Sequence, residues 1–176
     1  KTYISIPNEL GPTNGMIAYW KFENNLNDLS GNKYNNGTLV DVNYVKGIDG
    51  NCVIFNGSTS TISMSDILNM GYEDRSYSCW FKSNQSSGSG LSQIIFSKSD
   101  NGTSPCRHFF GITTADKMYA WMSGNPNTNQ YSTLTGATIN VCDNSWHHVA
   151  VTYNRRGNLT LYLDGQIEGI PVDISI

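Results

Sequence analysis

The sequence has few charged residues and no basic run. Asp, Glu, Lys and Arg make up 14% of its 176 residues, and the formal net charge is −3. Proteins that bind nucleic acid or an anionic membrane surface gather Lys and Arg on one face. Here Lys and Arg never run beyond two in a row. The sequence therefore argues against both kinds of partner.

Long apolar segments and helical periodicity are also lacking. No apolar run approaches the length needed for membrane insertion. No window of useful length repeats apolar residues at helical spacing, and the best helical candidate is a single turn near residues 66–70. Low charge with abundant Gly, Ser, Thr and Asn is typical of short strands joined by polar turns.

Metal-binding cysteine patterns and nucleophile motifs are missing as well. The four cysteines, Cys52, Cys79, Cys106 and Cys142, lie far apart without CxxC spacing. Cys79 falls in an apolar strand and is predicted to be a buried thiol, and one or two disulfides stay an open alternative. The chain contains neither G-x-S-x-G nor HExxH, and its acidic residues are scattered. Catalysis is not expected.

What the sequence does contain is a series of short strands separated by turn signals such as Asn56-Gly57 and Asp164-Gly165. Many short strands without helices indicate a sandwich or a barrel. Residues 1–15, with Pro7 and Pro12, are predicted to be a linker or leader holding at most one strand at residues 3–6, and the domain is expected to span residues 16–176. Strands are predicted at 16–22, 37–42, 51–55, 60–64, 76–83, 93–98, 107–113, 117–123, 146–154 and 159–164.

Five segments resemble the laminin G-like, concanavalin A-like jelly-roll family. They are a hairpin at residues 146–165, reading W-H-H-V-A-V-T-Y and then L-Y-L-D-G, and segments 17–23, 27–32, 50–57 and 76–82. The resemblance implies an all-β, two-sheet antiparallel β-sandwich, a jelly roll. Family members continue beyond this hairpin with two closing strands, which are not found here. Open sheet edges would result, so we expect a second fragment, a strand donated by a partner polypeptide, or a truncated topology.

The loop at residues 28–32 is the candidate metal site. Ca²⁺ prefers several converging oxygen ligands, which an Asx-rich loop can supply. The related modules often hold a structural Ca²⁺ here. The candidate ligands are Asp28, Ser30, Gly31 and Asn32. The alternative is a plain turn that Asp28 and Ser30 cap through side-chain bonds to the backbone.

One tryptophan is a candidate for stacking on a sugar ring. Trp20, Trp80 and Trp146 lie in the motif strands and are predicted to be core. Trp121 instead precedes a segment dense in Asn and Gln, which favours a stacking platform; the alternative is a half-buried strand residue. The expected ligand-binding set is Trp121, Tyr119, Arg107, His108, Asn125, Asn127 and Gln130.

His147 and His148 are predicted to be scaffold, because adjacent strand residues point to opposite faces. The expected function is a non-catalytic carbohydrate-binding or adhesion module of a secreted or cell-surface protein. One form of this function is an accessory domain of a glycan-degrading enzyme. The alternatives are a protein-interaction domain completed by a partner strand and, third, a glycan hydrolase. Jelly-roll folds serve all three.

Overall fold

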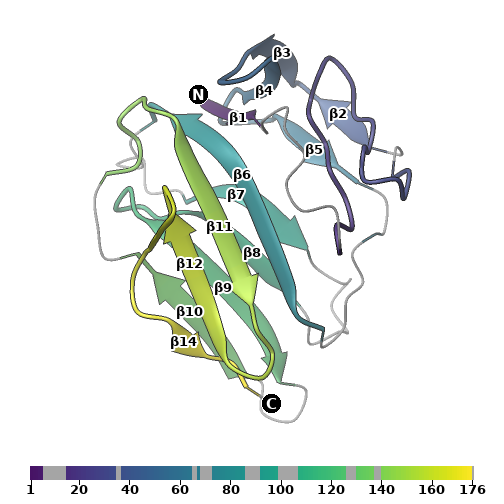
Figure 1. The fold of residues 1–176 in the computed structure, drawn as a ribbon. Helices are drawn as coiled ribbons and strands as arrows, with labels where there is room; N and C mark the ends of the chain where they lie inside the picture. The colour runs from purple at the N-terminus through teal and green to yellow at the C-terminus, as the bar shows by residue number, and fades with distance from the viewer. Residues whose placement is uncertain are drawn as a thin grey trace.

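The computed structural model describes residues 1–5, 15–34, 37–64, 67, 73–85, 92–98, 107–125, 130–136 and 140–175. Every regular element in these ranges is a β-strand, and all strand pairs are antiparallel (Figure 1). The all-β prediction is confirmed. Among the described residues, no helix is long and apolar enough to cross a membrane.

The strands form one large sheet, one four-stranded sheet and a separate two-stranded ribbon. The large sheet runs in the order β13 (Gln166–Ile167), β12 (Asn158–Leu163), β11 (His147–Tyr153), β6 (Arg75–Ser83), β1 (Thr2–Ser5), β4 (Asn51–Phe55) and β3 (Asn43–Lys46), with β14 (Val172–Asp173) also paired to β12. The four-stranded sheet runs β10 (Gln130–Thr135), β9 (Met118–Asn125), β8 (His108–Ile112) and β7 (Gln93–Lys98). The ribbon joins β2 (Thr38–Val40) to β5 (Thr61–Ser63).

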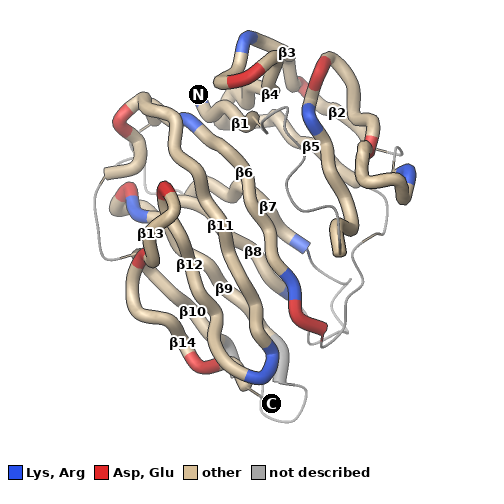
Figure 2. Tube along the Cα trace, viewed as in Figure 1, with Lys and Arg blue, Asp and Glu red and all other residues tan. Residues whose placement is uncertain are grey.

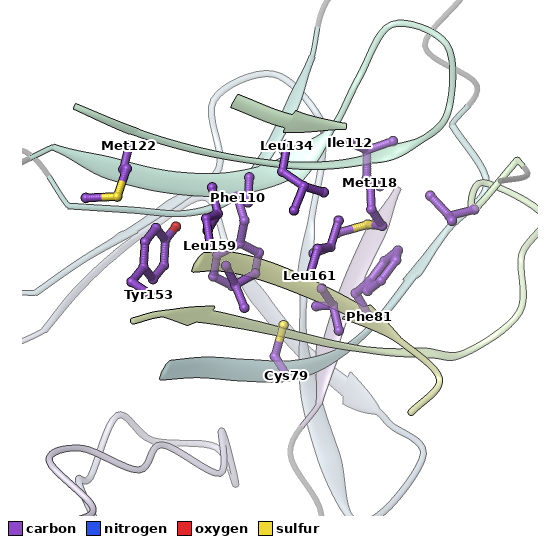
Figure 3. Packing of buried hydrophobic residues seen from close by; sticks show 14 of the residues in the cluster. Cys79, Phe81, Phe110, Ile112, Met118, Met122, Leu134, Tyr153, Leu159 and Leu161 are labelled. Atoms are coloured by element: carbon purple, nitrogen blue, oxygen red, sulfur yellow. The ribbon is translucent and has the colours of Figure 1, made fainter. Parts of the chain in front are cut away.

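The core lies between the two larger sheets, as Figure 3 shows for part of the cluster. Leu159 and Leu161 of β12 are fully buried there, with Phe110 of β8 and Leu134 of β10. Alternate residues of each strand face this core, because side chains of a strand point to opposite faces in turn. Burial of their apolar surface, at roughly 25 cal/mol per Å², is what holds the layers together. The predicted sandwich is confirmed.

Residues 2–5 of the expected leader belong to the large sheet. Strand β1 pairs with β4 on one side and with β6 on the other. Ile4 lies opposite both Val53 and Phe81 and is 8% exposed. The strand expected at residues 3–6 thus forms as β1, and burial of Ile4 with strand partners on both sides makes it an inner strand of the large sheet. The rest of the expected leader, apart from Lys1 and Gly15, lies outside the described residues.

The strand predicted at residues 16–22 does not form. Among the described residues, the only strand-like pairing of this segment is an isolated bridge between Trp20 and Asp28, and Phe22 has a φ of 61°. The Asp28 carboxylate accepts the backbone N–H of Tyr19 at 2.9 Å. This N–H is therefore not available for a hydrogen bond to a neighbouring strand. Four of the described strands were not predicted: β3, β10 and the two-residue strands β13 and β14. The single turn of helix expected near residues 66–70 lies outside the described residues except for Ile67, which is not helical.

Candidate functional site

Three aromatic side chains gather on the outer face of the four-stranded sheet. Met118 and Ala120 of β9 face the core and are fully buried, so Tyr119 and Trp121 point away from it. Phe109 of β8 shares this face. The rings of Phe109 and Trp121 stack with centroids 5.0 Å apart and an interplanar angle of 16°. Tyr119 meets Phe109 edge-on at 5.5 Å and 75°. We call Phe109, Tyr119 and Trp121 the Trp121 patch.

The strand register fixes the geometry of this patch. Phe109 lies directly opposite Trp121 in the β8–β9 pairing, and such cross-strand aromatic pairs stabilise a sheet by about 0.2–1 kcal/mol. Thr133 and Thr135 of β10 lie opposite Trp121 and Tyr119 and are exposed. Burial raises the pKa of the Tyr119 hydroxyl, so it stays protonated at neutral pH. The patch therefore offers half-buried, mutually supported rings beside hydroxyl groups.

Of the predicted ligand set, Trp121 and Tyr119 come together, whereas His108 lies elsewhere. The His108 side chain is 3% exposed and its Nε2 lies 2.6 Å from the hydroxyl of Tyr77. The two rings also stack at 5.2 Å. His108 alternates with Phe109 along β8 and therefore faces the core instead of the patch. Arg107 is exposed and immediately precedes β8.

Two of the remaining predicted residues, Asn125 and Gln130, lie at one end of the β9–β10 hairpin. Asn125 and Gln130 are paired across it. Asn127 lies outside the described residues. Phe109 was missed by the sequence reasoning. The sequence could have indicated an outward aromatic residue here, because Phe109 and Phe110 are adjacent on one strand and only one of them can face the core.

At the candidate metal loop, both carboxylate oxygens of Asp28 accept hydrogen bonds. Oδ1 accepts the N–H groups of Tyr19 and Ser30, each at 2.9 Å. Oδ2 accepts the Ser30 hydroxyl at 2.8 Å and the N–H of Tyr34 at 3.1 Å. Partial burial opposes ionisation, but these bonds outweigh it and lower the pKa of Asp28.

This arrangement fits a capped turn better than a cation site. Donor groups converge on one carboxylate, whereas Ca²⁺ needs several oxygens that converge on one point. The Asn32 amide donates to the carbonyl oxygen of Ile17 at 2.8 Å, and Gly31 takes a φ of 98°, as a tight turn requires. No three His, Cys, Asp or Glu side chains gather into a metal-binding group within the described ranges. Structural calcium at this loop stays a prediction that the geometry does not favour.

The two adjacent histidines face opposite sides of the large sheet, as the alternation predicts. The His147 ring lies 5.8 Å from that of Phe81, a core residue, whereas the His148 ring lies 5.4 Å from that of Trp80. His147 is held between two carboxylates, with Nδ1 2.8 Å from Asp164 and Nε2 3.2 Å from Asp143. His147 therefore holds structure in place, and the two rings do not share one site.

The prediction that Trp20, Trp80 and Trp146 are core residues is wrong. All three are half-buried. Phe81 of β6 faces the core, so its neighbour Trp80 must face outward, and Trp146 meets the edge of Tyr3 at 6.3 Å. The Trp20 indole donates to the carbonyl oxygen of Tyr34 at 3.1 Å, in the loop region. Apolar composition alone did not show which face each tryptophan takes.

A sequence profile of the concanavalin A-like lectin/glucanase superfamily, laminin G type, matches residues 56–172. No curated protein matches the sequence. Solved structures do match. The binding domain of Paraclostridial Mosquitocidal Protein 1 superposes with a TM-score of 0.66 at 15% identity, and the alignment covers 97% of this chain and 42% of that one.

Two further matches are complexes of a toxin binding domain. The binding domain of botulinum neurotoxin DC with rat synaptotagmin II gives a TM-score of 0.63 at 21% identity, covering 90% of this chain and 39% of that one. The same toxin's binding domain with SialylT gives 0.63 at 20% identity, with 90% and 39% covered. At these identities the likeness shows the fold, and the chain spans about two fifths of these structures.

Proposed function

The chain belongs to the concanavalin A-like lectin/glucanase superfamily, and from that premise we propose that it is a non-catalytic module that binds carbohydrate through the Trp121 patch. We place it in a secreted or cell-surface protein, where it would hold a larger protein on a glycan. The matched structures are binding domains by their names, which supports a binding role.

The observation that carries the proposal is the stack of Phe109 and Trp121 on the outer sheet face. A pyranose ring presents C–H groups on one face, and flat aromatic side chains bind such a surface while excluding water. Thr133 and Thr135 lie beside the rings and can bond sugar hydroxyls. Because the rings are already stacked on one another, little side-chain entropy is lost on binding.

The patch offers binding chemistry and no reaction chemistry. Its three side chains are aromatic, so it holds no carboxylate, thiol or imidazole that could act as a nucleophile or a general acid. A retaining glycosidase needs two carboxyl groups about 5–5.5 Å apart across the scissile bond. The hydrolase alternative has no support at this site.

Protein binding is the second candidate, and the sheet topology favours it at one place. β7 ends the four-stranded sheet in its described strand order, so one side of its backbone has no strand partner there. An unpaired edge can accept an extended segment of another polypeptide. Ile94 on β7 is 51% exposed and would contact such a segment.

Affinity electrophoresis through gels containing neutral polysaccharides, followed by a glycan array, tests the main proposal. We expect retardation of the wild type and loss of most of it in Trp121→Ala and Phe109→Ala. Trp20→Ala, which removes a half-buried tryptophan from the loop region outside the four-stranded sheet, is the matched control and should bind as the wild type does. Absence of binding to every glycan, together with a stable complex with another protein, would favour the edge-strand alternative.

A further inference from the structure

A second aromatic group lies on the outer face of the large sheet, on the far side of the core from the Trp121 patch. Tyr3 of β1 pairs with Lys82 of β6, and Trp146 immediately precedes β11. The Lys82 ammonium lies 5.1 Å from the centroid of the Tyr3 ring and 5.7 Å from that of Trp146. The two rings meet edge to face at 6.3 Å and 65°. One cation is thus held between two aromatic rings.

The neighbouring cross-strand position extends this surface. Trp80 lies two residues before Lys82 on β6 and faces the same way. It pairs with His148 of β11, and their rings are 5.4 Å apart. We call Tyr3, Trp80, Lys82, Trp146 and His148 the Lys82 patch. All five side chains are half-buried.

The surface around Lys82 points to an anionic ligand. Within the part of the chain that the structure describes, the Lys82 ammonium makes no ion pair and no hydrogen bond; the two aromatic rings are its neighbours. Figure 2 shows that charged residues lie mainly in turns and at strand ends, so the surface of β11 and β12 carries few charges. Burial lowers the pKa of His148, so its ring is neutral at pH 7. Lys82 is therefore the one formal charge among these five side chains, and the Asp164 carboxylate, which accepts the His148 N–H at 2.8 Å, borders the patch at its His148 end.

A cation between aromatic rings is a poor fit to a purely apolar partner, because its charge would be desolvated without compensation. It is also a poor fit to a neutral glycan, which would leave the ammonium without an anion. A sugar that bears a carboxylate can interact with both the cation and the aromatic rings of this surface. Its acid group pairs with Lys82 in a charge-assisted hydrogen bond, and its ring face stacks on Trp146 or Trp80.

We propose that the Lys82 patch is a second carbohydrate site, specific for an acidic sugar, on the opposite face of the sandwich from the Trp121 patch. In Figure 1, β11 and β12 lie in front of β8 and β9, and no described segment crosses in front of β11. The site goes beyond the function proposed for the Trp121 patch and does not depend on it. With both sites in use, the module would bridge two glycan chains.

Polygalacturonate, a polymer of carboxylated sugars, is the probe, and binding is measured by isothermal titration calorimetry at 50 and 200 mM NaCl. Lys82→Met removes the charge and keeps the apolar stem, and Trp146→Ala removes a ring. We expect each to weaken binding roughly tenfold or more, the size of one charge-assisted or stacking contact. Lys46→Met, at an exposed lysine of β3 in the same sheet, is the charge-matched control and should change affinity less than about twofold. Circular dichroism of each variant confirms folding.

Three results would overturn the proposal. One is absence of polygalacturonate binding by the wild type. Another is polygalacturonate binding that Lys82→Met and Trp146→Ala leave unchanged, since the polymer would then bind outside the Lys82 patch. The third is binding that Trp121→Ala abolishes, because the acidic sugar would then occupy the other face. Failure of Trp121→Ala to weaken neutral-glycan binding contradicts the earlier proposal alone, so the two can fail separately.

Discussion

The Nδ1 atom of His147 lies 2.8 Å from Oδ2 of Asp164, while Oδ1 of the same carboxylate accepts the backbone N–H of His148 at 2.8 Å. One carboxylate in the turn after β12 thus fixes the start of β11 through two neighbouring residues. Asp143 contacts the other ring nitrogen of His147 at 3.2 Å. Desolvation opposes protonation of the imidazole, but the two carboxylates outweigh it and raise its pKa above the ordinary 6.5.

This clamp predicts a pH-dependent stability. Because the pKa of His147 is raised on folding, its contribution is complete below about pH 6.5, where the carboxylates are still ionised, and is lost as the pH rises through the folded pKa. Urea denaturation measures the free energy of unfolding. Near pH 6 its value for the wild type should exceed that for His147→Gln by up to about 1 kcal/mol. The difference should shrink towards pH 9. Asp164→Asn should flatten the profile, and a difference that grows with pH would contradict the clamp.

The Asp28 turn predicts a loss of stability without any metal. Asp28→Ala removes an acceptor of three N–H groups and one hydroxyl, and we expect it to lower the free energy of unfolding by about 1–3 kcal/mol. Asp41→Asn is the matched control. Asp41 is exposed with a φ of 50°, which Asn tolerates, so this change should cost less than about 0.5 kcal/mol.

Calcium should leave the melting temperature unchanged if the loop is a capped turn. Thermal unfolding in 1 mM CaCl₂ is compared with unfolding in EDTA, since any ligand that binds the folded state raises its stability. A higher melting temperature with Ca²⁺ that disappears in Asp28→Ala would instead establish the calcium site expected from the family resemblance.

Gly111 on β8 should tolerate no side chain. A Cβ atom there would lie closer than contact distance to the carbonyl oxygen of Gln93 on β7, beside the register shift between Ile94 and Phe96. The backbone of β7 would have to move, so Gly111→Ala should lower the free energy of unfolding by about 1–3 kcal/mol. Ser97→Ala, at an exposed position of the same strand pair, should be nearly neutral. Wild-type stability in Gly111→Ala would mean that β7 lies farther from β8.

The three described cysteines should resist labelling in the folded protein. Cys52, Cys79 and Cys142 are free and buried, and burial raises the pKa of Cys79 to about 12 and that of Cys52 to about 11. The thiolate is the reactive form, so Ellman's reagent at pH 8 should modify at most one thiol of the native chain, Cys106. All four should react in guanidinium chloride. Rapid native labelling in Cys106→Ser would show that a described thiol is accessible.

The sequence predicted strands best where local pattern and pairing agree. Residues 51–55 and 93–98 form strands with the predicted bounds, because each holds three consecutive β-branched or aromatic residues and turn residues lie near their ends. The segment at 16–22 has a similar composition, but the carboxylate of Asp28, just beyond this segment, accepts the backbone N–H of Tyr19. β10 was missed because it begins within the segment dense in Asn and Gln that follows Trp121, and Leu134 is its one fully buried described side chain.

The sequence could predict that two neighbouring strand residues face opposite sides of a sheet, but not which of the two faces the core. Alternation required His147 and His148 to separate, and they do. It could not tell which of Phe109 and Phe110, or of Trp80 and Phe81, faces the core, because that choice depends on strand pairings that are distant in sequence. The outward positions of Phe109 and Trp80 therefore became known from the three-dimensional structure. Both aromatic patches depend on such choices.

The inner position of β1 constrains the order in which the domain can form. Residues 2–5 are synthesised before their partners on β4 and β6, which follow about 50 and 80 residues later, a high sequence separation that slows folding. In the described sheet, β3 and β4 reach β6 by backbone hydrogen bonds through β1 alone. A fusion partner attached before Lys1 would thus leave from the middle of the sheet, where crowding would hinder the final pairing. A tag placed after the last strand would avoid that hindrance.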